Sequence, residues 1–279
     1  MLLQQTWIKV LLWLLVGCYL IACDSLGSGT EVGENLDLKA LYEEERVEGC
    51  FLLRALKSDQ LYVYNPRRCE RHFLPASTFK IVNAMIALET GVAPDENFII
   101  PWDSVKRQFK AWNQDHSLKT AFQASSVPYY QAIARRIGVE RMQAGVQRLQ
   151  FGKMDIRAEN LTSFWLTGNS RITPYEQLDF LTRFAQKELP IKPSTYQKMN
   201  DIMIMASGED GLVMRGKTGW AIVDDRNIGW FVGYLERSDG ERFVFVNNIE
   251  CKVGTLPDDM FMASRKRIVG KVLQRLGVI

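Results

Sequence analysis

The chain has 279 residues, of which 47% are hydrophobic and 11% aromatic, enough for one or two domains with a substantial apolar core. The 35 lysines and arginines exceed the 32 acidic residues only slightly, and the formal net charge is +3. Apart from the run Arg265–Arg267, the basic residues are dispersed among acidic ones. The composition therefore predicts a globular protein and argues against nucleic acid as its partner.

The first 23 residues are typical of an export signal. Lys9 precedes an apolar run over 10–22 that is too short for a comfortable transmembrane helix. The run ends in LIAC, which resembles the lipobox of bacterial lipoproteins and predicts lipidation of Cys23. The earlier LVGC, ending at Cys18, fits the same pattern, and an uncleaved anchor or an ordinary signal with an incidental cysteine are the alternatives. We expect a periplasmic or other extracytoplasmic location, with a lipid anchor to the membrane.

Residues 24–35 are rich in glycine, serine and acidic residues and predict a flexible tether. A single folded domain is expected over 36–279, and the sequence does not indicate its oligomeric state. Cys50 and Cys69 flank a predicted hairpin in this domain. The sequence leaves open whether they form a disulfide or remain buried thiols.

The elements expected along the chain begin with a hairpin formed by GCFLLRAL and LYVYNP around the turn KSDQ. From Ser77 the apolar residues fill most of a helix surface, which predicts a buried helix that ends near Gly91. Residues from about 103 to 200 are mostly helical in pattern. From Gly211 onward, three strand-like segments alternate with turns, and a last helix is expected over about 258–276.

Strands at both ends of the domain, with helices between them, predict an α+β fold. We expect an antiparallel sheet built from the two ends, helices covering it, and a mostly helical subdomain formed by the insert at about 103–200.

A serine and a lysine at the start of the buried helix are the first chemical signal. Ser77 and Lys80 are three residues apart and share a helix face. A serine hydroxyl needs a base to become nucleophilic, and a lysine amine is such a base when burial lowers its pKa from about 10.4. A surface S-x-x-K is common, but KTG at 217–219 is the second motif that accompanies it in penicillin-binding enzymes.

Other catalytic centres are not indicated. His72 and His116 are too isolated for a metal site, and no GxSxG motif accompanies a serine triad. No metal is expected.

Four motifs together resemble the class D serine β-lactamases, the oxacillinase family. They are PASTFK around Ser77, SSV at 125–127, FWL at 164–166 and KTGW at 217–220, and 112–138 resembles the family at almost every position. The resemblance spans the folded body and implies the penicillin-binding serine transferase/hydrolase fold. It also implies hydrolysis of β-lactam antibiotics through a serine acyl-enzyme, with no cofactor other than carbon dioxide or bicarbonate for carboxylation of a lysine.

The resemblance assigns roles around the nucleophile. Ser77 attacks the β-lactam carbonyl, and Lys80, carboxylated on its side-chain nitrogen, holds the general base. Trp165 donates its indole N–H to the carbamate. Ser125 passes a proton toward the leaving ring nitrogen, and Val127 is the apolar residue beside the modified lysine.

The resemblance also assigns a substrate-binding strand. Lys217 and Thr218 bind the substrate carboxylate, and Gly219 lets the chain pass close to the ligand. The oxyanion lies between the backbone N–H groups of Ser77 and Trp220.

Arg265 and three loops complete the expected site. Arg265 is either an additional carboxylate ligand with a two-pronged guanidinium or part of a solvated basic face. Substrate preference is expected to depend on the loops near Trp112, Leu166 and the turn at 222–228.

One departure and three rival functions accompany the resemblance. FGK at 151–153 stands where the family usually has Tyr-Gly-Asn or a Phe variant, which affects local loop packing.

Three other functions remain alternatives to β-lactam hydrolysis. They are a β-lactam receptor domain that is acylated irreversibly, a cell-wall transpeptidase, and a lipid-anchored binding protein without turnover.

Overall fold

The computed structural model describes residues 34–208 and 211–279. The predicted export signal, both candidate lipidation sites and most of the tether lie outside the described residues. No helix in the described ranges is long and apolar enough to cross a membrane. Glu34 and Asn35, the last two residues of the predicted tether, form strand β1, which pairs in parallel with Tyr62 and Val63.

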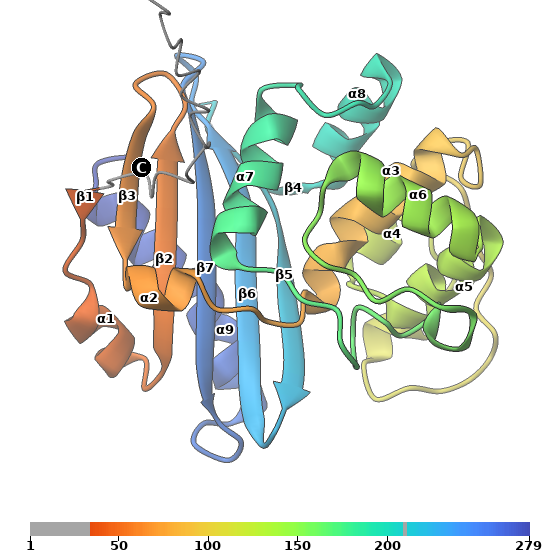
Figure 1. Ribbon diagram of the computed structural model, residues 1–279, viewed down its shortest axis with the longest axis horizontal. Helices are drawn as coiled ribbons and strands as arrows, with labels where there is room; N and C mark the ends of the chain where they lie inside the picture. Colours follow the sequence, from red (N-terminus) through yellow and green to blue (C-terminus); the bar gives the residue numbers. More distant parts are fainter. Residues whose placement is uncertain (1–33, 209–210) are drawn as a thin grey trace, which may run out of the picture. The chain divides into compact units, whose positions relative to one another are not determined.

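A seven-stranded sheet forms the centre of the described chain, in the order β1-β3-β2-β7-β6-β5-β4 (Figure 1). Every neighbouring pair is antiparallel except β1 with β3. Pairing of β2 with β7 joins the two ends of the domain in one sheet, as the sequence predicts. The strands are β1 (Glu34–Asn35), β2 (Glu48–Ala55), β3 (Gln60–Tyr64), β4 (Ile204–Ser207), β5 (Val213–Val223), β6 (Arg226–Glu236) and β7 (Arg242–Lys252).

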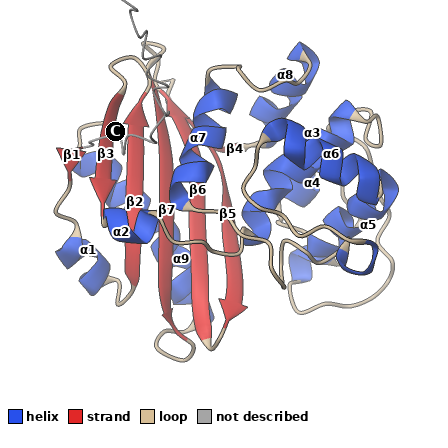
Figure 2. Ribbon diagram, in the orientation of Figure 1, coloured by secondary structure: helices blue, strands red, loops and turns tan. Residues whose placement is uncertain are grey.

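Helices cover both faces of this sheet and continue beyond β5 (Figure 2). The α-helices are α1 (Lys39–Glu44), α2 (Pro66–Cys69), α3 (Lys80–Glu89), α4 (Leu118–Gln123), α5 (Val127–Ile137), α6 (Val139–Leu149), α7 (Pro174–Ala185), α8 (Pro193–Ile202) and α9 (Asp258–Arg275). Short 3₁₀ turns are η1 (Ala76–Phe79), η2 (Lys110–Trp112) and η3 (Ala158–Asn160).

Alternation along the central strands explains the two covering layers. In β6, Val232 and Tyr234 belong to the same core as Phe180 of α7, whereas Phe231 belongs to the core that contains Phe261 of α9. Successive strand residues point to opposite faces of a sheet, so α7 and α9 pack on opposite faces. The antiparallel sheet with helices on both sides is the fold that the sequence predicts.

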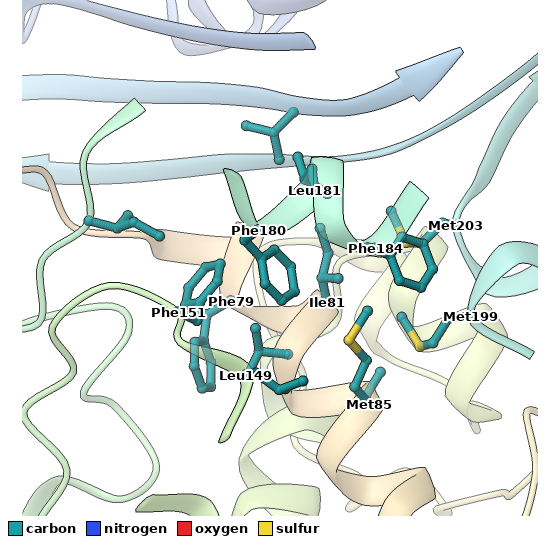
Figure 3. Packing of buried hydrophobic residues seen from close by; sticks show 14 of the residues in the cluster. Phe79, Ile81, Met85, Leu149, Phe151, Phe180, Leu181, Phe184, Met199 and Met203 are labelled. Carbon is teal, nitrogen blue, oxygen red and sulfur yellow. The ribbon is translucent and has the colours of Figure 1, made fainter. Parts of the chain in front are cut away.

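The helical subdomain is organised around α3, which is buried from Lys80 to Leu88. Helices α5, α6 and α8 all pack against α3. Figure 3 shows Ile81 and Met85 of α3 between side chains of α7 and α8, among them Phe184 and Met199. The apolar surface predicted for this helix is therefore surrounded on several sides, and its position is fixed relative to the sheet.

The predicted hairpin is present, with Ala55 of β2 opposite Gln60 of β3. Cys50 and Cys69 are both buried free thiols in the structure. A hydrogen bond between the two thiols, together with burial, raises the pKa of Cys69 above its usual range. The question that the sequence left open is thus answered in favour of thiols, placed next to each other at the junction of β2 and α2.

Candidate active site

The predicted nucleophile lies on a strained turn at the edge of the sheet. Ala76, directly before Ser77, has a φ of 51° and is fully buried. A left-handed conformation costs a non-glycine residue about 1–2 kcal/mol, and such conformations concentrate at functional sites. Ser77 follows within η1, and its side chain is half-buried. The serine is therefore held at a defined position, with its hydroxyl still accessible.

Lys80 contacts that serine directly. Its Nζ lies 2.7 Å from Ser77 Oγ, and the lysine side chain is fully buried at the start of α3. Burial lowers the pKa of Lys80 to about 7. At neutral pH a large fraction of the amine is uncharged, and an uncharged amine can accept a proton from the serine hydroxyl.

The lowered pKa makes stability depend on pH. The unfolded chain keeps the proton of Lys80 up to its ordinary pKa of 10.5, whereas the folded chain loses it near 7. Wild-type stability is therefore expected to rise by about 1.4 kcal/mol per pH unit between these values through this residue. We predict that Lys80→Met, measured by urea unfolding in bicarbonate-free buffer, is more stable than wild type at pH 6, and that this advantage shrinks toward pH 10. A constant difference across the range would contradict the burial of a titrating amine.

Trp165 supplies an unpaired hydrogen-bond donor and packs against Phe79, the residue before this lysine. The side chain is fully buried and stacks on Phe79, the residue before Lys80, with ring centres 5.7 Å apart. Its Nε1 has no acceptor among the described residues. Buried donors are rarely left unpaired, because the loss of hydration costs free energy. The indole N–H therefore indicates that an acceptor belongs beside it.

The predicted Ser-x-Val motif forms the turn between α4 and α5. Ser125 has a φ of 53°, and its N–H donates to Phe122 O at 3.1 Å. Val127 is half-buried at the first position of α5. Tyr130 of the same helix lies over the lysine, with Lys80 Nζ 5.6 Å from its ring centre. Helix α5 thus places the motif on the side of α3 that carries Lys80.

Strand β5 brings a second buried amine to the site. Lys217 Nζ donates to Thr218 O at 3.1 Å and lies 5.6 Å from the ring centre of Phe122. Burial lowers the pKa of Lys217 well below its ordinary value, and the charges of Lys80 and Arg265 lower it further. These interactions show that β5 and α3 present their lysines to a common region. Thr218 is half-buried there.

The strand approaches the nucleophile turn closely at Gly219. A Cβ at this position would lie 3.2 Å from both Pro75 O and Thr78 Cγ2. A side chain at this position would crowd the turn, which favours glycine, and the predicted close approach to a ligand stays a prediction. The next residue, Trp220, donates its indole N–H to Asn227 Oδ1 at 2.8 Å. This contact fixes the side chain of the residue whose backbone N–H is predicted to bind the oxyanion.

Arg265 lies behind the strand on α9. It is only 7% exposed, so its assignment to a solvated face is wrong, although its neighbours Lys266 and Arg267 are exposed. Its Nη1 donates to Gly219 O at 2.7 Å and its Nε to Met262 O at 2.8 Å. Burial lowers its pKa to about 10. The guanidinium therefore supports the backbone of β5 in addition to placing positive charge near Lys217.

A groove adjoins the two motif residues of β5. Its lining residues are Phe122, Gln123, Ile204, Met205, Gly216, Lys217, Thr218 and Lys266. Leu166 is half-buried and packs against the main core rather than lining this groove. Lys217 and Lys266 both line this groove, and an anionic group bound between them would favour the protonated form of Lys217, whose pKa is otherwise lowered by burial.

The unusual segment at 151–153 retains its packing. Phe151 is fully buried, with its ring centre 5.9 Å from that of Phe79 and 4.9 Å from that of Phe180. Gly152 has a φ of 53°, and Lys153 is exposed. The lysine that replaces the expected asparagine is thus on the surface, and the buried aromatic residue maintains the contact with the nucleophile turn.

Several residues of the site escaped the sequence analysis. Gln177 of α7 is fully buried and donates to Thr78 Oγ1 at 2.8 Å, and Ser126 is buried beside Ser125. No motif indicates them, because Gln177 contacts a residue far away in the sequence and Ser126 belongs to a helix cap.

His72 is exposed, and His116 is bonded to Ala111 O and Thr120. The described ranges contain no group of three or more potential metal ligands.

Comparisons with known proteins agree with this geometry. The family model "Penicillin binding protein transpeptidase domain" matches residues 43–274. "Probable beta-lactamase YbxI" of Bacillus subtilis is 38% identical over 85% of this chain and 84% of its own. "Beta-lactamase OXA-48" of Klebsiella pneumoniae is 35% identical over 88% of this chain and 90% of its own.

The solved structures give the same assignment. The crystal structure of a class D β-lactamase, YbXI from Nostoc, superimposes with a TM-score of 0.81 at 39% identity. The match covers 87% of this chain and 99% of that one. The chain therefore belongs to the class D β-lactamases and shares their penicillin-binding transpeptidase fold.

Proposed function

We propose that this class D enzyme hydrolyses β-lactam antibiotics through an acyl-enzyme on Ser77, with its general base held on Lys80. The observation that carries the proposal is the 2.7 Å separation of Lys80 Nζ and Ser77 Oγ at a lysine that is fully buried. A buried amine with a pKa of about 7 explains why a lysine lies in an apolar helix.

Acylation is assigned to the side chains of Ser77, Lys80 and Ser125. Ser77 Oγ attacks the carbonyl carbon of the lactam and loses its proton toward Lys80. The backbone N–H groups of Ser77 and Trp220 stabilise the negative charge that develops on the carbonyl oxygen. The carbon–nitrogen bond of the ring then breaks, and the nitrogen receives a proton through Ser125. The product is an ester on Ser77 with an opened ring.

Deacylation requires a base that survives acylation of the serine. The residues fit a carboxylated lysine, because burial favours the uncharged amine of Lys80 and Trp165 Nε1 has no acceptor in the described part of the chain. Carbon dioxide bound to the amine would supply a carboxylate that accepts protons. Trp165 would stabilise that anion with its indole N–H, and Val127 would limit access of solvent to it. Water then hydrolyses the ester, and Ser77 regains its proton.

Substrate binding is assigned to strand β5. Lys217 and Thr218 are proposed to bind the substrate carboxylate, with Arg265 increasing the positive charge behind them. Gly219 allows β5 to lie against the nucleophile turn, which brings these groups toward Ser77. Leu166 is proposed to limit the apolar side of the site.

A chromogenic β-lactam mixed with the purified protein separates this function from its rivals. Steady hydrolysis over many equivalents is the expected result. A single burst of one equivalent would instead indicate a receptor or transpeptidase that remains acylated, and no signal would indicate a binding protein.

We further propose that residues 1–23 direct export, that Cys23 carries a lipid and that the chain up to β1 is a tether. The proposal rests on the LIAC pattern, since these residues lie outside the described ranges. Cys23→Ser is expected to move the protein from the membrane fraction to the soluble extracytoplasmic fraction, as measured by fractionation and immunoblotting. Retention of Cys23→Ser in the membrane, with release of Cys18→Ser, would assign the lipid to Cys18.

A further inference from the structure

The turn that carries Ser77 is held by buried side chains from different elements. Trp230 of β6 donates its indole N–H to Leu74 O at 2.9 Å. Thr78 donates its hydroxyl to Pro75 O at 2.7 Å, and Gln177 of α7 donates to Thr78 Oγ1 at 2.8 Å. The carbonyl groups of Leu74 and Pro75, which directly precede the strained Ala76, are thus each bound by a side chain. The side chain that binds Pro75 O, that of Thr78, is itself bound by Gln177.

Gln177 is the most distant member of this chain of hydrogen bonds. It is fully buried, and its Oε1 has no partner among the described residues. Its neighbours on α7 include Phe180 and Leu181, which Figure 3 shows in the apolar core near Phe79. A half-satisfied amide in such a core is costly compared with an apolar side chain of the same size. Packing alone therefore does not explain a glutamine at this position.

The chemistry of a hydroxyl explains what the amide does. The Thr78 hydroxyl has one hydrogen and can rotate to any nearby acceptor. When Gln177 Nε2 donates to the oxygen, the hydroxyl hydrogen remains free to point at Pro75 O, and successive bonds in such a chain strengthen one another. Without the amide, the hydroxyl loses this orientation and the Pro75 carbonyl is bound less firmly.

We propose that Gln177 is a positioning residue for the nucleophile, acting through Thr78 on the turn at Ala76. This inference rests on the proposed role of Ser77. Pro75 O also accepts the backbone N–H of Thr78 at 3.2 Å, so loss of the hydroxyl bond loosens the turn without opening it. Ala76, with its φ of 51°, then relaxes in part, and Ser77 Oγ shifts relative to Lys80 Nζ. Because Pro75 O and Thr78 also face Gly219, the same movement changes the distance between the serine and the strand predicted to bind the substrate.

Gln177→Met tests the inference, because methionine is similar in size but cannot donate to Thr78. We expect the single-turnover acylation rate constant to fall about tenfold, the loss typical of one buried hydrogen bond, while the dissociation constant of the non-covalent complex stays within about twofold. Thr78→Val should show the same loss, and Thr78→Ser, which keeps the hydroxyl, should restore most of the rate. The double variant Gln177→Met/Thr78→Val should be no slower than Thr78→Val alone.

Thr182→Val is the matched control. Thr182 lies on the same helix, is 6% exposed, and its Oγ1 has no hydrogen-bond partner among the described residues. The Thr182→Val protein should be acylated by the β-lactam at the wild-type rate. The inference is wrong if Gln177→Met is acylated at the wild-type rate, or if Thr182→Val is acylated as slowly as Gln177→Met. It is also wrong if the double variant Gln177→Met/Thr78→Val is slowed by the product of the two single losses.

Two comparisons keep the result unambiguous. If Gln177→Met does not fold, Gln177→Leu takes its place in the same assay. Equal rates of Thr78→Val and Thr78→Ser would by themselves overturn the inference, because Gln177 is proposed to act through that hydroxyl. Full activity of Ser77→Ala would instead overturn the proposed function itself. An inactive Ser77→Ala together with fast acylation of Gln177→Met would reject only the positioning role.

Discussion

Ser77→Ala is expected to abolish β-lactam hydrolysis and leave the fold intact. The serine is half-buried on the surface of its turn, so removal of one oxygen creates no large cavity. Lys80 Nζ loses its partner at 2.7 Å, and the attacking oxygen itself is removed. The loss of turnover should exceed about 10⁴-fold, as is typical when a nucleophile is removed from a group of residues that act together. Hydrolysis of a chromogenic β-lactam and a thermal melt measure the two parts of this prediction.

The matched control is Ser170→Ala, which deletes the same atom from a serine that is fully buried, whereas Ser77 is half-buried. Ser170 Oγ accepts a hydrogen bond from Asp155 N at 3.0 Å and has no assigned role in the reaction. Normal turnover is expected for this control. Unchanged turnover in a folded Ser77→Ala protein would remove the mechanism altogether.

Removal of the indole N–H of Trp165 is expected to make activity strongly dependent on bicarbonate. A carboxylated Lys80 would lose its carbon dioxide in bicarbonate-free buffer, so wild-type activity should fall there and recover on addition of bicarbonate. A buried anion that lacks one donor is less stable by about 1–3 kcal/mol, so Trp165→Phe should need roughly tenfold to a hundredfold more bicarbonate. Trp165→Ala should show the same shift with a further loss from the cavity.

Steady-state hydrolysis across a bicarbonate titration measures this shift. Deacylation should be impaired more than acylation, because it requires a base when Ser77 is already esterified, and intact-mass spectrometry should therefore detect accumulated acyl-enzyme in both variants. Activity should also fall at acid pH, where carbamates decompose. Equal bicarbonate dependence in wild type and Trp165→Phe would contradict the assigned role of the indole.

The local pattern of the sequence was sufficient to predict much of the fold. The turn KSDQ between alternating apolar segments predicts the β2–β3 hairpin, and the nearly continuous apolar surface after Ser77 predicts the buried helix α3. Both features depend on neighbours in the chain. The order of strands depends on long-range pairing, so only the joining of the two chain ends was predicted, and it is confirmed by β2 beside β7.

The supporting contacts of the site were not predictable for the same reason. Gln177 and Thr78 are 99 residues apart, and no spacing rule connects α7 with the nucleophile turn. The left-handed conformations of Ala76 and Ser125 are imposed by tertiary contacts against the preference of both residue types. The sequence left a solvated face open as the alternative for Arg265, because its exposed neighbours in the basic run do not indicate which side of α9 meets the sheet.

Nuclear magnetic resonance with ¹³C-labelled bicarbonate tests the base on Lys80 most directly. Wild-type protein is expected to give a carbamate carbon signal that disappears in Lys80→Met and on acidification, and that returns at neutral pH together with hydrolysis of a β-lactam. A fully active wild-type protein without this signal, whose activity is indifferent to bicarbonate, would show that Lys80 acts as a plain amine and would contradict the mechanism.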